Sequence, residues 1–167
     1  MQMKHKVLII MGSDSDLPLM EEAGKMLDSF AIPYEMRIAS AHRSPELVDE
    51  IVSRAEKDGV AAIIAGAGAA AHLAGVIASK TTLPVIGVPI DSSPLKGIDA
   101  LYATVQMPPG VPVATMAVGR AGAKNAGIFA AQIIASSDRK VERLLKDFKR
   151  SLAADVKRKS RIKDVNR

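Results

Sequence analysis

The sequence predicts an α/β fold, a three-layer αβα sandwich in which helices cover both faces of a parallel sheet. Two observations lead to this prediction: short apolar runs alternate with segments of helical spacing, and those runs are apolar at nearly every position. A strand buried on both faces has this uniform character, whereas a strand with one face in water alternates apolar and polar residues. Helical connections between parallel strands then follow from the right-handed crossover rule.

The first strand is expected at residues 6–11, where an apolar run ends in a polar loop. The helix after that loop is indicated by apolar residues at intervals of three and four, namely Met20, Ala23, Leu27 and Phe30. Asp16 is expected to cap this helix. Pro18 falls in its first turn, where a missing N–H costs little.

A second unit repeats this plan. Residues 34–39 are expected to form the second strand, and the next helix is expected to begin with Ser44 as its cap and Pro45 in the first helical position. The apolar face of that helix consists of Leu47, Val48, Ile51, Val52 and Ala55.

Three further strands complete the alternation. They are expected at residues 60–65, 83–90 and 111–118. The accompanying helices are expected in a Gly/Ala segment that ends near Lys80, at residues 98–105 and at residues 122–136. Gly66-Ala67-Gly68 is interpreted as the turn after the third strand. We therefore expect a flavodoxin-like sandwich.

The basic charge is concentrated in a C-terminal amphipathic helix. Of the net charge of +5, residues 1–138 contribute 11 Lys/Arg against 14 Asp/Glu, and residues 139–167 contribute 12 against 4. Apolar residues in this second segment recur at helical spacing, namely Val141, Leu144, Leu145, Phe148, Leu152 and Val156. Nucleic-acid binding is the alternative for so basic a segment, but the apolar stripe and the 3% aromatic content favour a packing helix.

Composition argues against several classes of protein and site. The chain has no Cys, so disulfides and Cys-bearing metal sites are excluded, and the cytoplasm is the expected compartment. Residues 59–79 carry no charge apart from that of His72, but glycines interrupt them, so a membrane span is the minority interpretation. No Asp/His grouping has metal-ligand spacing, and no dinucleotide fingerprint is present.

Polar residues gather in the loops after the first three strands. Because ligands collect at the carboxyl ends of parallel strands, these loops should converge on one site. The first loop offers Ser13, Ser15 and Asp16, the second offers Ser40, His42 and Arg43, and the third offers Gly66, Gly68 and His72.

Three of these residues form a candidate phosphate site. Ser15, Ser40 and Arg43 all donate hydrogen bonds, and a helix start adds partial positive charge. Either serine taken alone is better explained as a capping or turn residue. Asp16 is suited to accept hydrogen bonds from a ribose diol, although an acid ahead of a helix is more often only a cap.

The two loop histidines have different expectations. His42 is the natural general acid/base, because an imidazole titrates near working pH. His72 is set among Ala residues, and by itself it is expected to be a packing residue.

Four motifs occur in order along the chain, and Lys124-Asn125-Ala126 follows them. They are Gly12-Ser-Asp-Ser-Asp16, Ser40-Ala-His-Arg-Ser-Pro45, Gly66-Ala-Gly-Ala-Ala-Ala-His-Leu-Ala-Gly75 and Gln106-Met-Pro-Pro-Gly-Val-Pro112. Together they resemble the PurE family, which comprises N5-carboxyaminoimidazole ribonucleotide mutases. The similarity runs from about residue 6 to residue 136.

The resemblance implies an enzyme of purine biosynthesis that converts N5-carboxyaminoimidazole ribonucleotide into 4-carboxyaminoimidazole ribonucleotide, without metal or organic cofactor. It implies His42 as the proton shuttle and Asp16 as the ribose ligand, with Ser15, Ser40 and Arg43 on the phosphate. The other residues placed against the substrate are Ser13, Ala41, Ala67, Gly68, His72 and Leu73, of which the last two close the pocket.

The same resemblance implies a cytoplasmic homo-octamer with a small-molecule ribonucleotide substrate and no nucleic-acid or membrane partner. Residues 1–167 would form one catalytic domain, with a core at about 6–136 and a helical extension at about 138–158 that packs on a neighbouring subunit. Functional coupling to the ATP-dependent carboxyaminoimidazole ribonucleotide synthase is compatible with this assignment.

The third loop departs from the family pattern at two positions. Ala69 stands where the family commonly has Gly, and Ala74 where it commonly has Pro, so a slightly reshaped loop is expected. A related branch carboxylates aminoimidazole ribonucleotide directly with CO₂. That branch typically has Lys after the second-loop His and lacks the His-Leu element, so Arg43, His72 and Leu73 favour the mutase branch. A non-catalytic phosphate- or flavin-binding protein on the same fold is the alternative from another class.

Overall fold

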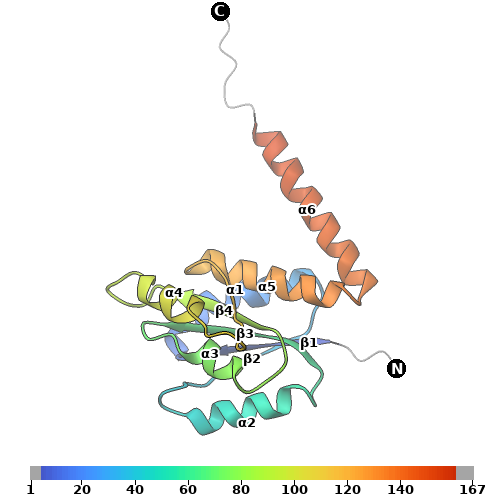
Figure 1. Cartoon of the computed structure of the whole chain (residues 1–167). Coiled ribbons are helices and arrows are strands. Elements are labelled where there is room, and N and C mark those ends of the chain that lie inside the picture. Colours follow the sequence, from blue (N-terminus) through green and yellow to red (C-terminus); the bar gives the residue numbers. More distant parts are fainter. Residues whose placement is uncertain (1–4, 161–167) are drawn as a thin grey trace, which may run out of the picture.

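The computed structural model describes residues 5–160, in which a parallel five-stranded sheet lies between two layers of helices (Figure 1). The strands are β1 (Lys6–Met11), β2 (Tyr34–Ile38), β3 (Val60–Gly68), β4 (Val85–Ile90) and β5 (Ala114–Thr115). Their order in the sheet is β2-β1-β3-β4-β5, which is the flavodoxin-like order of doubly wound sheets. The predicted fold class is confirmed.

Helices connect the strands, and two more follow the last of them. They are the 3₁₀ helix η1 (Asp14–Asp16) and the α-helices α1 (Leu17–Ser29), α2 (Pro45–Ala55), α3 (Leu73–Ala78), α4 (Ile98–Val105), α5 (Arg120–Ala135) and α6 (Arg139–Lys159). None of the helices within residues 5–160 is long and apolar enough to cross a membrane.

Alternation along β1 divides the core into two clusters. Val7, Ile9 and Met11 point to the face covered by α1 and α5, and Leu8 and Ile10 point to the face covered by α2 and α3. All five side chains are buried, as the uniformly apolar run predicts.

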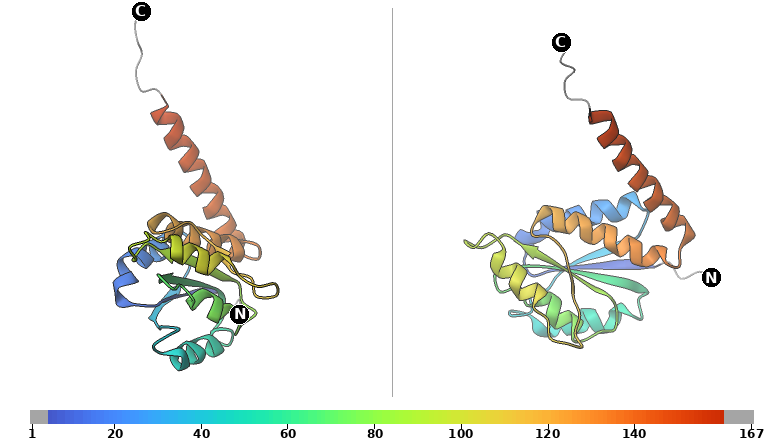
Figure 2. Two further views of the ribbon diagram at one scale, coloured as in Figure 1. Left: turned by 60° about the vertical axis from the view of Figure 1, so that its left-hand side comes forward. Right: turned by 45° about the horizontal axis from the view of Figure 1, so that its top comes forward.

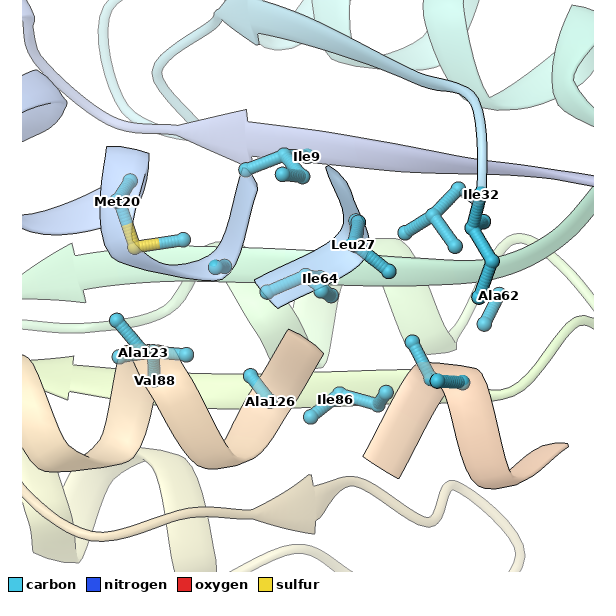
Figure 3. Packing of buried hydrophobic residues seen from close by; sticks show 14 of the residues in the cluster. Ile9, Met20, Leu27, Ile32, Ala62, Ile64, Ile86, Val88, Ala123 and Ala126 are labelled. Carbon is cyan, nitrogen blue, oxygen red and sulfur yellow. The ribbon is translucent and has the colours of Figure 1, made fainter. Parts of the chain in front are cut away.

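On the first face, small residues bring the helices close to the sheet and to each other. Figure 3 shows Ala123 and Ala126 of α5 beside Ile86 and Val88 of β4. At Gly127 a Cβ would lie 2.6 Å from the carbonyl oxygen of Ala23 in α1, so only glycine allows this approach.

The opposite face also carries α4. A Cβ at Gly87 of β4 would lie 2.4 Å from Thr104 of α4 and 3.5 Å from Ala74 of α3, so both helices contact the same side of the sheet. The second of the two views in Figure 2 shows this layer.

Two expected strand boundaries are wrong. β3 continues through Gly66-Ala67-Gly68, which pairs with residues of β4 and is not a turn. The actual turn comes at Ala69, whose φ is 48°. β5 has only two residues in place of the expected eight, because Pro112 cannot donate to a ladder and the strand lies at the edge of the sheet.

Two expected caps are also wrong, although both helices begin where the sequence predicts. Neither Asp16 nor Ser44 makes a side-chain capping hydrogen bond. The Ser44 hydroxyl instead accepts a bond from the Ser40 N–H at 3.0 Å, which closes the second loop on itself.

The C-terminal helix α6 is half packed and half projecting. Asp138 caps it by accepting hydrogen bonds from the N–H groups of Lys140 and Val141. The Phe148 ring packs edge-on against Phe30, with the ring centroids 5.5 Å apart. Beyond this contact the helix leaves the body of the molecule (Figures 1 and 2), and Leu152 is 52% exposed.

Candidate active site

The loops that follow β1, β2, β3 and β4 converge at the carboxyl edge of the sheet, as expected for the first three. They enclose a pocket of about 290 Å³. Its lining consists of Gly12, Ser13, Ser15, Asp16, Ser40, Ala41, His42, Arg43, Ala67, Gly68, Ala69, Ala70, Leu73 and Ser92. Every residue predicted from the sequence to contact substrate is in this set except His72, which contacts His42 instead.

The first loop presents two linked hydroxyl groups. The Ser15 hydroxyl donates to the Ser13 hydroxyl over 2.9 Å, and the Ser15 N–H donates to the carboxylate of Asp14 over 3.0 Å. These hydrogen bonds hold the loop at the start of η1, and both hydroxyls lie on the pocket wall.

Asp16 lies at the base of this loop with only 5% of its surface exposed. Burial raises the pKa of its carboxyl group, because the charged form loses hydration. Hydrogen bonds from Ser13 and Ser15 and the positive charge of Arg43 act in the opposite direction without cancelling the effect. A buried carboxylate that borders a pocket is suited to accept hydrogen bonds from a polar ligand.

Arg43 connects the second loop to the first. Its guanidinium donates to the carbonyl oxygen of Gly12 over 2.9 Å, while its own backbone N–H donates to the Ser40 hydroxyl over 3.2 Å. Within residues 5–160 this is the one hydrogen bond that the guanidinium makes, which leaves its other donors for an anion in the pocket.

His42 and His72 come from different loops and contact each other directly. Nε2 of His42 lies 2.8 Å from Nδ1 of His72, and the two rings meet edge to face with an interplanar angle of 72°. Both side chains are exposed. The expectation that His72 by itself is a packing residue is therefore wrong, because His72 is exposed whereas its neighbours Ala71 and Leu73 are buried.

The third loop forms a wall with little side-chain bulk. A Cβ at Gly68 would lie 1.9 Å from the Ser92 hydroxyl oxygen, so the loop after β4 approaches β3 closely at this point. Ser92 was missed by the sequence analysis, which considered the loops after only three strands. The position of Ser92 two residues after the fourth predicted strand was the signal that could have revealed it.

Two of the sequence motifs lie outside the pocket lining. The loop at residues 106–112 exposes Pro108, Pro109 and Pro112 to solvent. Lys124 lies 3.4 Å from the buried carboxylate of Glu22, which Arg120 also contacts at 2.6 Å, and so ties α5 to α1. Hydrogen bonds from Lys25 and Lys124 lower the pKa of Glu22.

Within residues 5–160, no group of three or more His, Asp or Glu side chains is arranged to hold a metal ion. The polar groups of the pocket are hydroxyls, a guanidinium, one carboxylate and an imidazole, which are chemically suited to bind an anion or a sugar.

Comparison with known proteins identifies the family. Residues 6–155 match the family model described as AIR carboxylase. The chain belongs to the AIR carboxylase family. Among curated AIR carboxylase relatives, the N5-carboxyaminoimidazole ribonucleotide mutase of Pyrococcus horikoshii is 52% identical, over 93% of this chain and 89% of its own length. The mutase of the same name from Escherichia coli is 45% identical, over 90% of this chain and 89% of its own length.

A solved structure of this family has the same fold. The crystal structure of Treponema denticola PurE superposes with a TM-score of 0.85 at 29% identity, and the match covers 95% of this chain and 98% of the other. The resemblance to the PurE family and its mutases is thus confirmed over most of the chain.

Proposed function

We propose that this protein is an N5-carboxyaminoimidazole ribonucleotide mutase of purine biosynthesis, with His42 as its proton carrier. The observation that carries the proposal is the placement of His42 at the pocket beside Ser13, Ser15, Asp16, Ser40 and Arg43, in a chain about half identical to curated mutases. The reaction is inferred from the names of these relatives, and the pocket contains side chains suited to it.

The reaction needs one proton to be given and one to be taken. Loss of the N-carboxylate as CO₂ breaks the N–C bond and leaves an electron pair on nitrogen, which receives a proton from protonated His42. The ring carbon then attacks CO₂, and neutral His42 removes the proton from that carbon as the ring recovers its aromatic character. The histidine ends in the state in which it began, so no second acid/base is required.

The pocket must also hold CO₂ between the two steps. Ala41, Ala67, Ala70 and Leu73 contribute the apolar part of the pocket lining. Confinement in a pocket of this size favours recapture by proximity over escape to solvent.

The ribose phosphate is assigned to the polar side of the site. Ser15, Ser40 and Arg43 would bind the phosphate, and Asp16 the ribose diol. An adjoining hollow of about 300 Å³ shares Ser40 and Arg43 with the main pocket and provides room for these groups. The base and carboxylate would then lie against Ser13, Ala41, Ala67 and Gly68, with His72 and Leu73 closing this end.

Assembly into a homo-oligomer, an octamer by resemblance, forms part of the proposal. Besides the projecting part of α6, exposed apolar residues occur at helical spacing along α4 and the turn before it, namely Leu95, Ile98, Tyr102 and Val105. Apolar stripes of this kind on two elements favour burial between subunits. A cytoplasmic location and coupling to the synthase that makes the substrate are proposed with it.

The test is incubation of the protein with N5-carboxyaminoimidazole ribonucleotide, and separately with aminoimidazole ribonucleotide plus bicarbonate. We expect 4-carboxyaminoimidazole ribonucleotide from the first at low bicarbonate. Product from the second alone would assign the chain to direct carboxylation, and product from neither would favour a binding protein.

His42→Asn tests the role of His42 within the same assay. General acid/base groups contribute roughly 10²–10⁴-fold, and a step with no alternative base belongs at the upper end. We expect turnover to fall by about this factor while calorimetry reports near-normal substrate binding. Turnover within a few-fold of the parent would show that His42 is not the proton carrier.

A further inference from the structure

The contact between His42 and His72 links the second and third loops directly at the pocket, over 2.8 Å. Of these two histidines, His42 lines the pocket and His72 does not, and His42 contacts His72 through Nε2. Among the hydrogen bonds of the described residues, Nδ1 of His42 has no protein partner. The two nitrogens of His42 are therefore not equivalent: one is engaged by the protein and the other is available to a ligand.

A hydrogen bond between two imidazole nitrogens contains one proton. If Nε2 of His42 donates, His72 must accept at an unprotonated Nδ1 and carry its own proton on Nε2. His42 then keeps its Nε2 proton in both its neutral and its cationic form, and Nδ1 is the nitrogen that gains and loses a proton.

We propose that His72 is a positioning residue that holds the His42 ring and keeps the Nε2 proton in place, so that Nδ1 exchanges protons with the substrate. This inference rests on the proposed function, in which His42 gives one proton and takes another. The same Nε2–H bond persists through both steps, so the ring need not turn between them.

The third loop is built to hold His72 in this position. The His72 N–H donates to the carbonyl oxygen of Ala70 over 2.8 Å, and the next side chain, Leu73, is 2% exposed. The left-handed residue Ala69 sets the direction in which the chain enters this turn. A side chain on so constrained a backbone is an effective anchor for a partner on another loop.

Two substitutions separate positioning from proton transfer. In His72→Ala the partner of Nε2 is removed, and we expect kcat to fall roughly 10- to 100-fold, as when the orienting partner of a functional histidine is lost. Any rise in KM should be the smaller effect, because His72 meets the closed end of the site through His42 and is itself outside the pocket lining. His72→Asn places an amide oxygen near the former Nδ1, accepts the same hydrogen bond and cannot take up a proton, so kcat should return to within roughly fivefold of the parent.

Nuclear magnetic resonance supplies a readout that does not depend on activity. The chain has three histidines, which makes imidazole assignment direct. We expect a downfield Nε2–H proton signal from His42 in the parent and in His72→Asn, and its loss through exchange with water in His72→Ala. His5→Asn is the matched control, because His5 lies on a different hollow, near Phe30 and Asp138, and should leave both signal and kcat unchanged.

Three results would overturn the proposal. They are a parental kcat in His72→Ala, a parental His42 signal in that variant, and a folded His72→Asn as inactive as His72→Ala, which would make His72 a proton carrier. Failure of the proposed function is a separate result, since the parent would then lack mutase activity whatever the resonance signals show.

Discussion

Ala69 adopts a left-handed backbone conformation, with φ of 48°, in the turn that leads to His72. An L-residue pays roughly 1–2 kcal/mol for this conformation, whereas glycine adopts it without steric cost. We expect Ala69→Gly to raise the free energy of unfolding by about 1 kcal/mol, because relief of strain outweighs the greater entropy of glycine in the unfolded chain. Urea titration at equilibrium measures the change.

The neighbouring alanine provides the control. Ala70 is also exposed but is not among the positive-φ residues, so Ala70→Gly should lower the free energy of unfolding through chain entropy alone. A similar loss in both variants would show that the Ala69 backbone stores no strain.

Asp16 predicts a dependence of stability on pH. Burial raises its pKa in the folded protein above the ordinary value of 3.8. The folded state therefore binds a proton more readily than the unfolded state, and the penalty of the buried charge appears as pH rises from 3.8 through the folded pKa. Asp16→Asn removes that penalty, so we expect a higher Tm at neutral pH and a difference that vanishes as pH falls below the ordinary Asp value.

Calorimetric melts across this pH range provide the measurement, and Asp58→Asn is the control because Asp58 is exposed. A difference in Tm that is constant with pH would mean that the effect does not come from titration of Asp16. The same variant should bind substrate more weakly if Asp16 holds the ribose, which makes the buried charge a stability cost kept for function.

The placement of single residues at the pocket was predictable from the sequence where the residue closely follows the end of a strand. Asp16, His42 and Arg43 line the pocket because the ends of strands place them there. The absence of a Ser44 cap was not predictable, because its hydroxyl bonds to the Ser40 N–H, which only the folded loop brings within reach. The same reason explains why the contact of His72 with His42 was missed.

At the scale of elements, α1 and α5 pack at van der Waals contact through Gly127. A Cβ there would lie 2.6 Å from the Ala23 carbonyl and 2.9 Å from the Met26 Cβ. Because backbone cannot yield as a flexible side chain can, we expect Gly127→Ala to lower the free energy of unfolding by about 1–3 kcal/mol, despite the better helix propensity of alanine.

Asn125→Ala on the same helix is the matched control, since Asn125 is exposed and the change should be neutral or slightly stabilising. Thermal melts of both variants decide the comparison. A Gly127→Ala variant as stable as the control would show that α5 shifts freely on α1.

The existence of each strand was predictable, and the boundaries of two were not. Uniformly apolar runs marked β1, β3 and β4, because both faces of each strand are buried. Gly66-Ala67-Gly68 suits either a strand or a turn, and its pairing with β4 decides between them. β5 is short because it is an edge strand, paired on one side only, and because Pro112 interrupts the apolar run before it.

At the scale of the whole molecule, α6 makes two kinds of contact. Val141 and Leu145 are buried in the core, whereas Leu152 and Val156 are 52% and 69% exposed. Deletion of residues 139–167 would therefore damage the core together with any interface. Leu152→Gln combined with Val156→Gln tests the interface alone, because the buried half and the helix propensity are retained.

We expect this double variant to form a smaller assembly than the parent, by multi-angle light scattering, with an unchanged circular dichroism spectrum. Ala153→Gln, also on the exposed part of α6, is the control and should leave the mass unchanged. An unchanged mass for the double variant would remove the distal part of α6 from the subunit interface.

The assembly is also where prediction from one chain is weakest. The spacing of apolar residues predicts that α6 packs against another surface. Part of that surface is the core of its own chain, where Phe148 contacts Phe30. The exposed part of α6 shows that its apolar residues are not fully buried within one chain, but it does not identify the partner surface. Its acidic residues, such as Glu142 and Asp155, pair with nearby Lys and Arg along the helix and moderate its positive face.

The two layers of helices are completed at different stages of translation. The helices over one side of the sheet, α2, α3 and α4, have all emerged once residue 105 is made, because they come from the middle of the chain. The other side is shared between α1 and α5, which lie near opposite ends of the described chain, so Ile86 and Val88 stay uncovered until α5 is made. The nascent protein thus holds every pocket residue by Ser92 while one apolar surface remains open, and this interval is when a chaperone that shields hydrophobic surface has the most to protect.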